Sequence, residues 1–201
     1  MYRMLRFGVP TSTSTSPARD RLLAKAVEVA RQGGIADLSL REIAAAVGTS
    51  HRMLAYHFGS REGLLVAITQ AVEAAELARL AGGAMSVEGA WEFWKEITDP
   101  GLSAQERLFF ELYSYALLGR PGTEGFLDGI VESWVGPVAA QLVERGMDEA
   151  AARAEARLGV AVVRGLVLDL LATGDREGVD AAYRRYLERA LGESPDPGEA
   201  S

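Results

Sequence analysis

The sequence contains no cysteine and only two histidines. Without cysteine there is no disulfide, no thiolate nucleophile and no cysteine ligand for a metal ion. A metal site built on His51 would have His57 as its only histidine partner in the whole chain, so we expect neither a metal nor a cofactor. A glycine-rich phosphate loop, a metal-ligand cluster and a nucleophile elbow are also missing, which argues against an enzyme.

Long apolar runs are missing as well. No stretch of about 18 apolar residues occurs, which argues against a membrane span. The first residues include Arg3 and Arg6 but no long apolar core, unlike a secretory signal. These observations predict a cytoplasmic protein.

Basic residues are scarce overall, since the net charge is −7, but they are unevenly placed. Through Glu62 the chain has nine Lys and Arg against five Asp and Glu, whereas the remainder has twelve against twenty-three. A basic head on an acidic body is suited to binding DNA at one end only.

Two short helices joined by a tight turn are predicted within residues 38–62. Ser39 and Glu42 have the spacing of a capping box, and Gly48 stands where a left-handed helix stop is needed. Thr49 or Ser50 can cap the second helix. The apolar face consists of Leu40, Ile43, Ala44 and Val47 in the first helix, and Leu54 and Phe58 in the second. The pattern indicates a helix-turn-helix, whose second helix can enter a DNA major groove, although a generic three-helix bundle remains the alternative.

Gly48-Thr49-Ser50, followed by the run from Leu54 to Glu62, resembles the TetR family of bacterial repressors. The likeness is strong over residues 18–70 and concerns only the layout of helices beyond them. It implies an all-α protein with a helix-turn-helix DNA-binding domain at 17–62 and a helical ligand-binding and dimerisation domain at 63–191. The family usually has Tyr where this chain has Ala55, so one phosphate contact is missing.

The candidate DNA contacts fall into two groups. Hydroxyls, an imidazole and a guanidinium near helix N-termini are suited to phosphates; they belong to Thr49, Ser50, His57 and Arg61. Base edges are left to the outward side chains of the second helix, which are His51, Arg52 and Tyr56. Residues 1–16 are predicted to be a disordered arm, which either reaches the DNA through its two arginines or is a loose tail.

The body is predicted to contain five more helices after one that starts at Ser60 and continues to about Leu80. Their expected ranges are 86–98, 103–118, 126–145, 148–173 and 176–191, with a capping box formed by Ser103 and Glu106 and a frayed tail at 192–201. From Leu158 to Ala172 the only charges are Arg164 and Asp169. A helix this apolar needs cover on most sides, so residues 148–191 are predicted to form a homodimer interface, as the resemblance also implies.

Aromatic residues gather in the three central helices and favour a ligand pocket there, although core packing explains each one equally well. The candidate ligand-binding residues are Trp91, Trp94, Phe109, Tyr113 and Trp134. Asp128, Glu132 and Arg164 are either polar groups of this pocket or ordinary surface charges.

The sequence therefore predicts a transcriptional repressor that binds a pseudo-palindromic operator and is released by a small apolar or aromatic molecule. One alternative is a constitutive or partner-controlled regulator without an inducer. A second alternative is an enzyme built on a helical bundle.

Overall fold

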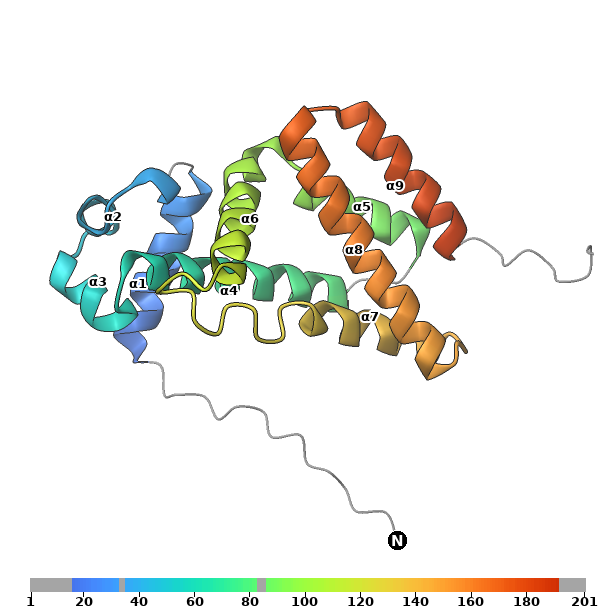
Figure 1. The fold of residues 1–201 in the computed structure, drawn as a ribbon, viewed down its shortest axis with the longest axis horizontal. Coiled ribbons are helices and arrows are strands. Elements are labelled where there is room, and N and C mark those ends of the chain that lie inside the picture. Colours follow the sequence, from blue (N-terminus) through green and yellow to red (C-terminus); the bar gives the residue numbers. More distant parts are fainter. Residues whose placement is uncertain (1–15, 33–34, 83–85, 192–201) are drawn as a thin grey trace, which may run out of the picture.

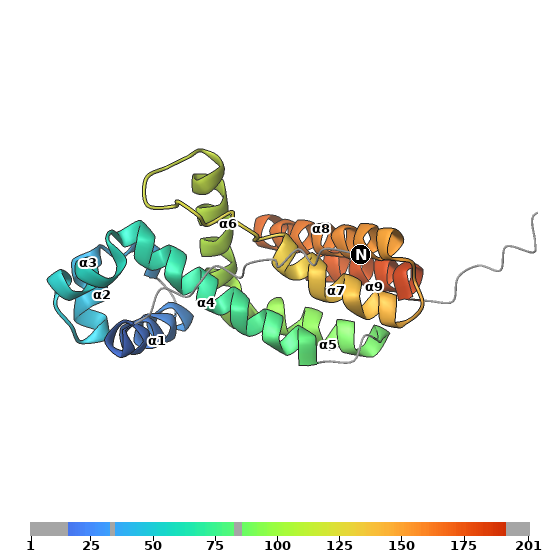
Figure 2. The same cartoon turned by 90° about the horizontal axis from the view of Figure 1, so that it is seen from below.

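Helix α4 (Arg61–Gly82) connects the two ends of the molecule in the computed structural model, which describes residues 16–32, 35–82 and 86–191. Figure 1 shows α1, α2 and α3 at one end of α4, and Figure 2 shows α5, α7, α8 and α9 gathered along its other half. The remaining helices are α1 (Pro17–Arg31), α2 (Leu40–Val47), α3 (His51–Phe58), α5 (Val87–Ile97), α6 (Ser103–Leu117), α7 (Glu132–Glu144), α8 (Glu149–Thr173) and α9 (Arg176–Leu191), with short 3₁₀ turns at Ile35–Asp37 and Pro100–Leu102. The described part of the chain is all-α, as predicted.

The N-terminal helices begin and end where local hydrogen bonding dictates. Ser39 and Glu42 form the predicted capping box, with Glu42 N–H donating to Ser39 Oγ at 3.3 Å and Ser39 N–H donating to Glu42 Oε2 at 2.8 Å. Gly48 ends α2 with a φ of +74°, a conformation that a residue without a Cβ adopts freely. Ser50 then caps α3 by accepting the Met53 N–H at 3.2 Å. These signals confirm the predicted helix-turn-helix.

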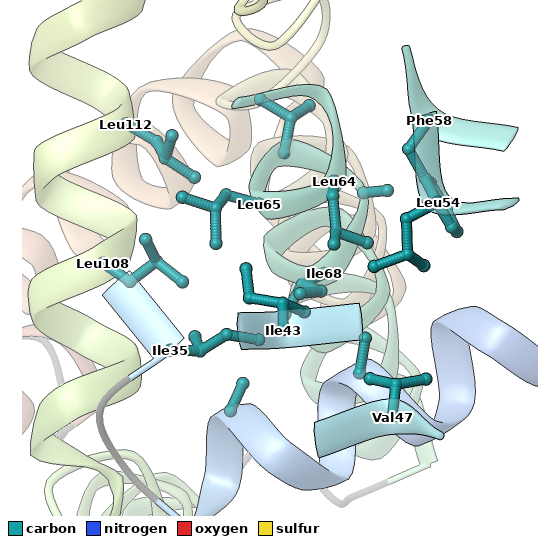
Figure 3. Packing of buried hydrophobic residues seen from close by; sticks show 14 of the residues in the cluster. Ile35, Ile43, Val47, Leu54, Phe58, Leu64, Leu65, Ile68, Leu108 and Leu112 are labelled. Carbon is teal, nitrogen blue, oxygen red and sulfur yellow. The ribbon is translucent and has the colours of Figure 1, made fainter. Parts of the chain in front are cut away.

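One apolar core joins helices α1 to α3, called the head below, to the body formed by α5 to α9. Ile43 of α2 and Leu54 of α3 are fully buried beside Leu64 and Leu65 of α4, and Leu112 of α6 closes the same cluster (Figure 3). The predicted boundary between residues 62 and 63 therefore runs through a shared core, and it stays a prediction.

The body packs around α8. Helix α7 lies along its first half, and α9 and α5 cover its second half. A Cβ on Gly159 would lie 2.6 Å from the Tyr186 hydroxyl, so this glycine permits the close approach of α8 and α9. Gly165 has no atom within 4 Å of that position and serves no such contact.

Two local predictions are wrong. Ser103 does not cap α6, because the preceding 3₁₀ turn runs straight into the helix and makes Ser103 its first residue. The predicted helix 126–145 begins only at Glu132, since the chain turns at Gly125 and Gly129, both with positive φ, and Phe126 is buried against α6 instead.

The predicted arm at 1–16, except Ser16, and the tail at 192–201 lie outside the described residues. None of the described helices is both long enough and apolar enough to cross a membrane.

Candidate nucleic-acid interface and ligand cavity

Helix α3 divides its residues between core and solvent. Leu54 and Phe58 are buried, whereas His51, Arg52 and Tyr56 are exposed, Tyr56 to 79%. An exposed tyrosine beside an arginine on a short capped helix offers hydrogen-bond donors and an aromatic face to a DNA groove. Contact of these three side chains with bases stays a prediction.

The predicted phosphate ligands are more engaged within the protein. Thr49 is half-buried, and the Ser50 hydroxyl accepts the capping hydrogen bond. The His57 ring lies edge-on to Tyr56, and its Nε2 is buried without a hydrogen-bond partner among the described residues. Arg61 donates from Nε to the Leu38 carbonyl at 2.8 Å, which ties the start of α4 to the segment before α2.

One positioning residue was not foreseen from the sequence. The Arg19 guanidinium of α1 lies 4.9 Å from the centre of the Phe58 ring, and its Nε donates to the His57 carbonyl at 3.4 Å. Arg19 thereby joins α1 to the C-terminal end of α3. No local pattern announces a contact between residues 38 positions apart.

A cavity of about 610 Å³ opens among α4 to α9. Its apolar wall comes from five helices and includes Phe93, Phe109, Phe110, Trp134, Val138, Val160, Val163, Tyr183 and Tyr186. This volume suits a drug-sized molecule, and mainly apolar walls with a few polar groups are typical of ligand pockets.

The predicted pocket aromatics separate into two sets. Phe109 and Trp134 line the cavity, whereas Trp91, Trp94 and Tyr113 do not. Trp94 is fully buried, stacks on Tyr183 at 4.5 Å between ring centres and donates from Nε1 to Asp180 Oδ1 at 2.7 Å.

The other two excluded aromatics also have structural contacts. Trp91 is covered by the Arg184 guanidinium, 3.8 Å from the ring centre, and Tyr113 packs against Phe109. Trp91 and Trp94 of α5 thereby contact α9, whereas Tyr113 contacts a ring of its own helix. Ligand contact by any of the five stays a prediction.

Acidic side chains on the cavity wall were missed by sequence reasoning. Glu73 and Glu76 of α4 and Glu106 of α6 all line the cavity. Burial, aided by the neighbouring carboxylates, raises the pKa of Glu76 to about 7 and that of Glu106 to about 8. Burial also raises the pKa of Glu73, opposed by a 2.8 Å hydrogen bond from Trp134 Nε1 and by Arg164.

The sequence contained a weak signal for these acids. Glu73 and Glu76 stand three apart in an alanine-rich stretch of helix, a spacing that puts both on one face, but such pairs usually face solvent. Of the three charged residues considered for the pocket, Arg164 lines it. Glu132 pairs outside with Arg153, at 2.7 Å, and Asp128 is exposed.

Comparison with known sequences and structures assigns the family. The sequence model of "Bacterial regulatory proteins, tetR family" matches residues 22–68, which span most of α1, the helix-turn-helix and the start of α4. Residues 22–68 therefore carry the DNA-binding domain of the TetR family, and the chain is a DNA-binding transcriptional regulator rather than an enzyme, as predicted.

Solved structures extend the likeness to the body. A TetR-family regulator from Pectobacterium atrosepticum is 21% identical with a TM-score of 0.66, covering 89% of this chain and 96% of its own. A transcriptional regulator from Rhodococcus sp. is 20% identical with a TM-score of 0.68, covering 89% and 100%. The multidrug binding protein EbrR, solved in complex with proflavin, is 27% identical with a TM-score of 0.57, covering 86% and 99%. No curated protein matches the sequence.

Proposed function

We propose that this TetR-family regulator is a homodimeric repressor that leaves its operator when a small molecule occupies the cavity. The observation that carries the proposal is the position of the cavity on α4. Glu73 and Glu76 of α4 line the cavity. The same helix begins at Arg61, whose Nε donates a hydrogen bond to the Leu38 carbonyl, just before α2. EbrR, with proflavin bound, supports a small-molecule effector for a chain of this fold.

A second contact couples the cavity to the head. Phe109 lines the cavity and packs against Phe126, 6.2 Å away between ring centres, in the segment that follows α6. That segment also presses on the first turn of α4, since a Cβ on Gly122 would lie 2.9 Å from Ser60 Oγ and 2.7 Å from Glu62 Cβ. A ligand that displaces Phe109 would therefore move α4 where it meets the head.

The proposed dimer interface lies on α8. An exposed stripe of small and apolar side chains runs along it at helical spacing: Leu158, Ala161, Gly165, Leu168 and Ala172. Two exposed leucines on a stripe whose one charge is Asp169, at its edge, favour burial against a second copy. With one reading helix per chain, a two-fold dimer would present two helices about one DNA turn apart, roughly 34–36 Å, or a multiple of it.

The variant Leu168→Glu should dissociate this dimer, because it places an unpaired carboxylate in an apolar interface. We expect sedimentation to show monomers and operator affinity to fall at least about tenfold, since half of a palindromic site is then lost. Val143→Glu is the matched control, as Val143 is similarly exposed but lies on α7. An intact Leu168→Glu dimer would place the interface elsewhere.

The variant Arg52→Ala should relax sequence preference at one base position in each half-site. A good bidentate contact to guanine contributes about 1–3 kcal/mol of discrimination. The control is Arg189→Ala, which removes an exposed arginine from α9, far from α3 (Figure 1). Competition between operator variants measures the preference, and equal preference in the Arg52→Ala variant and the parent would exclude Arg52 from base reading.

The proposed function is tested by protection mapping on the DNA upstream of the gene, followed by ligand titration. A compound that quenches tryptophan emission is titrated with and without the mapped operator. Because coupling between two sites is reciprocal, an inducer must bind more weakly in the presence of operator, by the same factor by which it weakens operator binding. Operator binding that no cavity ligand alters would instead support the constitutive or partner-controlled regulator.

A further inference from the structure

The cavity wall carries far more negative than positive charge. Six carboxylates face it, from Glu73, Glu76, Glu92, Glu96, Glu106 and Glu155. Only two guanidinium groups occur among the described lining residues, and each already interacts with another group of the protein. Arg79 pairs with Glu96 at 3.9 Å, while Arg164 donates to the Ile130 carbonyl at 2.8 Å and lies over the Phe109 ring.

The three innermost carboxylates differ in how they are compensated. Glu73 accepts from Trp134 and has Arg164 at 3.9 Å. Glu76 accepts a hydrogen bond of 3.2 Å from Gln105 Nε2. Glu106 is half-buried on the cavity wall and has no hydrogen bond or ion pair with any described residue. A partly desolvated carboxylate without a partner is unfavourable, so its negative charge on the cavity wall is uncompensated.

An unpaired acceptor lies next to Glu76, on Gln105, which does not itself line the cavity. Gln105 is 8% exposed, and its amide nitrogen donates a hydrogen bond to Glu76. Its Oε1 has no hydrogen-bond partner among the described residues. A buried carbonyl oxygen beside carboxylates calls for a hydrogen-bond donor. The carbonyl oxygen needs only a donor, whereas the carboxylates on the cavity wall also favour positive charge.

The positive group is not a metal ion. Within the described part of the chain, no three acidic or histidine side chains converge closely enough to hold one. The carboxylates are instead spread along a wall that contains the aromatic rings of Trp134 and Phe93, and aromatic faces attract organic cations.

We propose that the effector is an organic cation, a flat apolar body with an amine or quaternary nitrogen that lies against Glu106 and Glu76. This proposal rests on the proposed function, because it names the chemical class of the ligand for the same cavity. The apolar body fills the space between the aromatic rings, and the charged nitrogen supplies what Glu106 lacks.

Binding of such a cation should release protons. The groups facing these carboxylates are Glu73, Arg79 and Glu76 from α4, Arg31 from α1, Glu106 from α6, Glu92 and Glu96 from α5, Arg164 and Glu155 from α8, and Tyr183 and Tyr186 from α9. Because burial and mutual repulsion raise the pKa of Glu76 to about 7 and that of Glu106 to about 8, the empty cavity holds protons at neutral pH. A bound cation favours the ionised carboxylates, so its affinity must rise with pH between about 6 and 9.

The test compares two probes of the same shape on the full-length protein. 10-Methylacridinium carries a fixed positive charge, and 10-methylacridone is its neutral counterpart. Calorimetry at pH 6 and pH 9, in buffers of different ionisation enthalpy, measures affinity and proton release. We expect 10-methylacridinium to bind at least about tenfold more tightly at pH 9 than at pH 6, with protons released. The affinity of 10-methylacridone should change little.

The variant Glu106→Gln should weaken 10-methylacridinium binding at pH 9 by about tenfold and reduce the number of protons released, while 10-methylacridone binding is kept. Glu144→Gln on the exposed side of α7 is the control. Tighter binding of the neutral probe, or unchanged cation affinity in Glu106→Gln, overturns the proposal.

Operator release separates this proposal from the proposed function. If a neutral cavity ligand releases operator and the cation does not bind, regulation stands and the ligand class is wrong. If the cation binds with proton release but leaves operator affinity unchanged, the ligand class stands and regulation by this cavity is wrong.

Discussion

Replacing Leu112 by Ala should lower the free energy of unfolding by about 2–5 kcal/mol, the usual cost of such a cavity in a closed core. Leu112 belongs to α6, outside the predicted DNA-binding domain, yet it is 1% exposed in the same cluster as Leu54, Leu64 and Leu65 (Figure 3). Because the core of α1 to α3 is continuous with that of α4 and α6, we expect operator binding to be lost at the temperature where α6 melts. Denaturant unfolding and anisotropy with labelled operator measure the two effects.

The matched control is Leu117→Ala in the same helix. Leu117 is 66% exposed, so its truncation removes little buried surface and should change stability by less than about 0.5 kcal/mol. Equal losses in the two variants would contradict the shared core. A head that melts separately from α6 in the Leu112→Ala variant would contradict it as well.

Replacing Glu106 by Gln should raise the melting temperature at pH 8.5 and change it little at pH 5. In the folded protein, burial and the carboxylates of Glu76 and Glu73 raise the pKa of Glu106 from 4.5 to about 8. Between these values the folded state keeps a proton that the unfolded state releases, so the free energy of unfolding falls as pH rises through this window. At about 1.4 kcal/mol per pKa unit, the cost of the charged side chain reaches at most about 5 kcal/mol above pH 8.

Glutamine has nearly the same shape and no charge at any pH. The variant therefore does not lose stability through ionisation of this side chain as the pH rises. Glu144→Gln controls for the loss of one acid from an exposed position, and its effect should be small and equal at both pH values. A gain from Glu106→Gln that is as large at pH 5 as at pH 8.5 would mean that packing, not ionisation, explains it. Glu76 retains part of the slope in the variant, since its pKa is also raised, to about 7.

The helix-turn-helix was predictable because its signals are local. A Ser and a Glu three residues apart, a glycine with positive φ and a serine cap act within one or two turns of helix, so their outcome hardly depends on the rest of the chain. The same signal failed at Ser103, where the preceding 3₁₀ turn had already started the helix. Helix 126–145 failed because Gly125 and Gly129 favour turns that the apolar spacing does not reveal.

Helical spacing in the sequence does not determine which side chains of a helix face the cavity. Trp91, Phe93 and Trp94 are nearly adjacent in α5, and only Phe93 lines the cavity, because the rotation of α5 against α9 decides which face turns inward. The same holds for Glu106, an ordinary first-turn acid until α4 packs over it.

The sequence by itself determined the all-α class, the helix-turn-helix and the exposed His51, Arg52 and Tyr56, since capping and amphipathic spacing are properties of neighbouring residues. Only the tertiary structure decided that α6 closes the core of the head and that six glutamates line one cavity. The physical reason is that the pKa and the partners of a side chain depend on helices far away in sequence, whose packing angles no local pattern encodes.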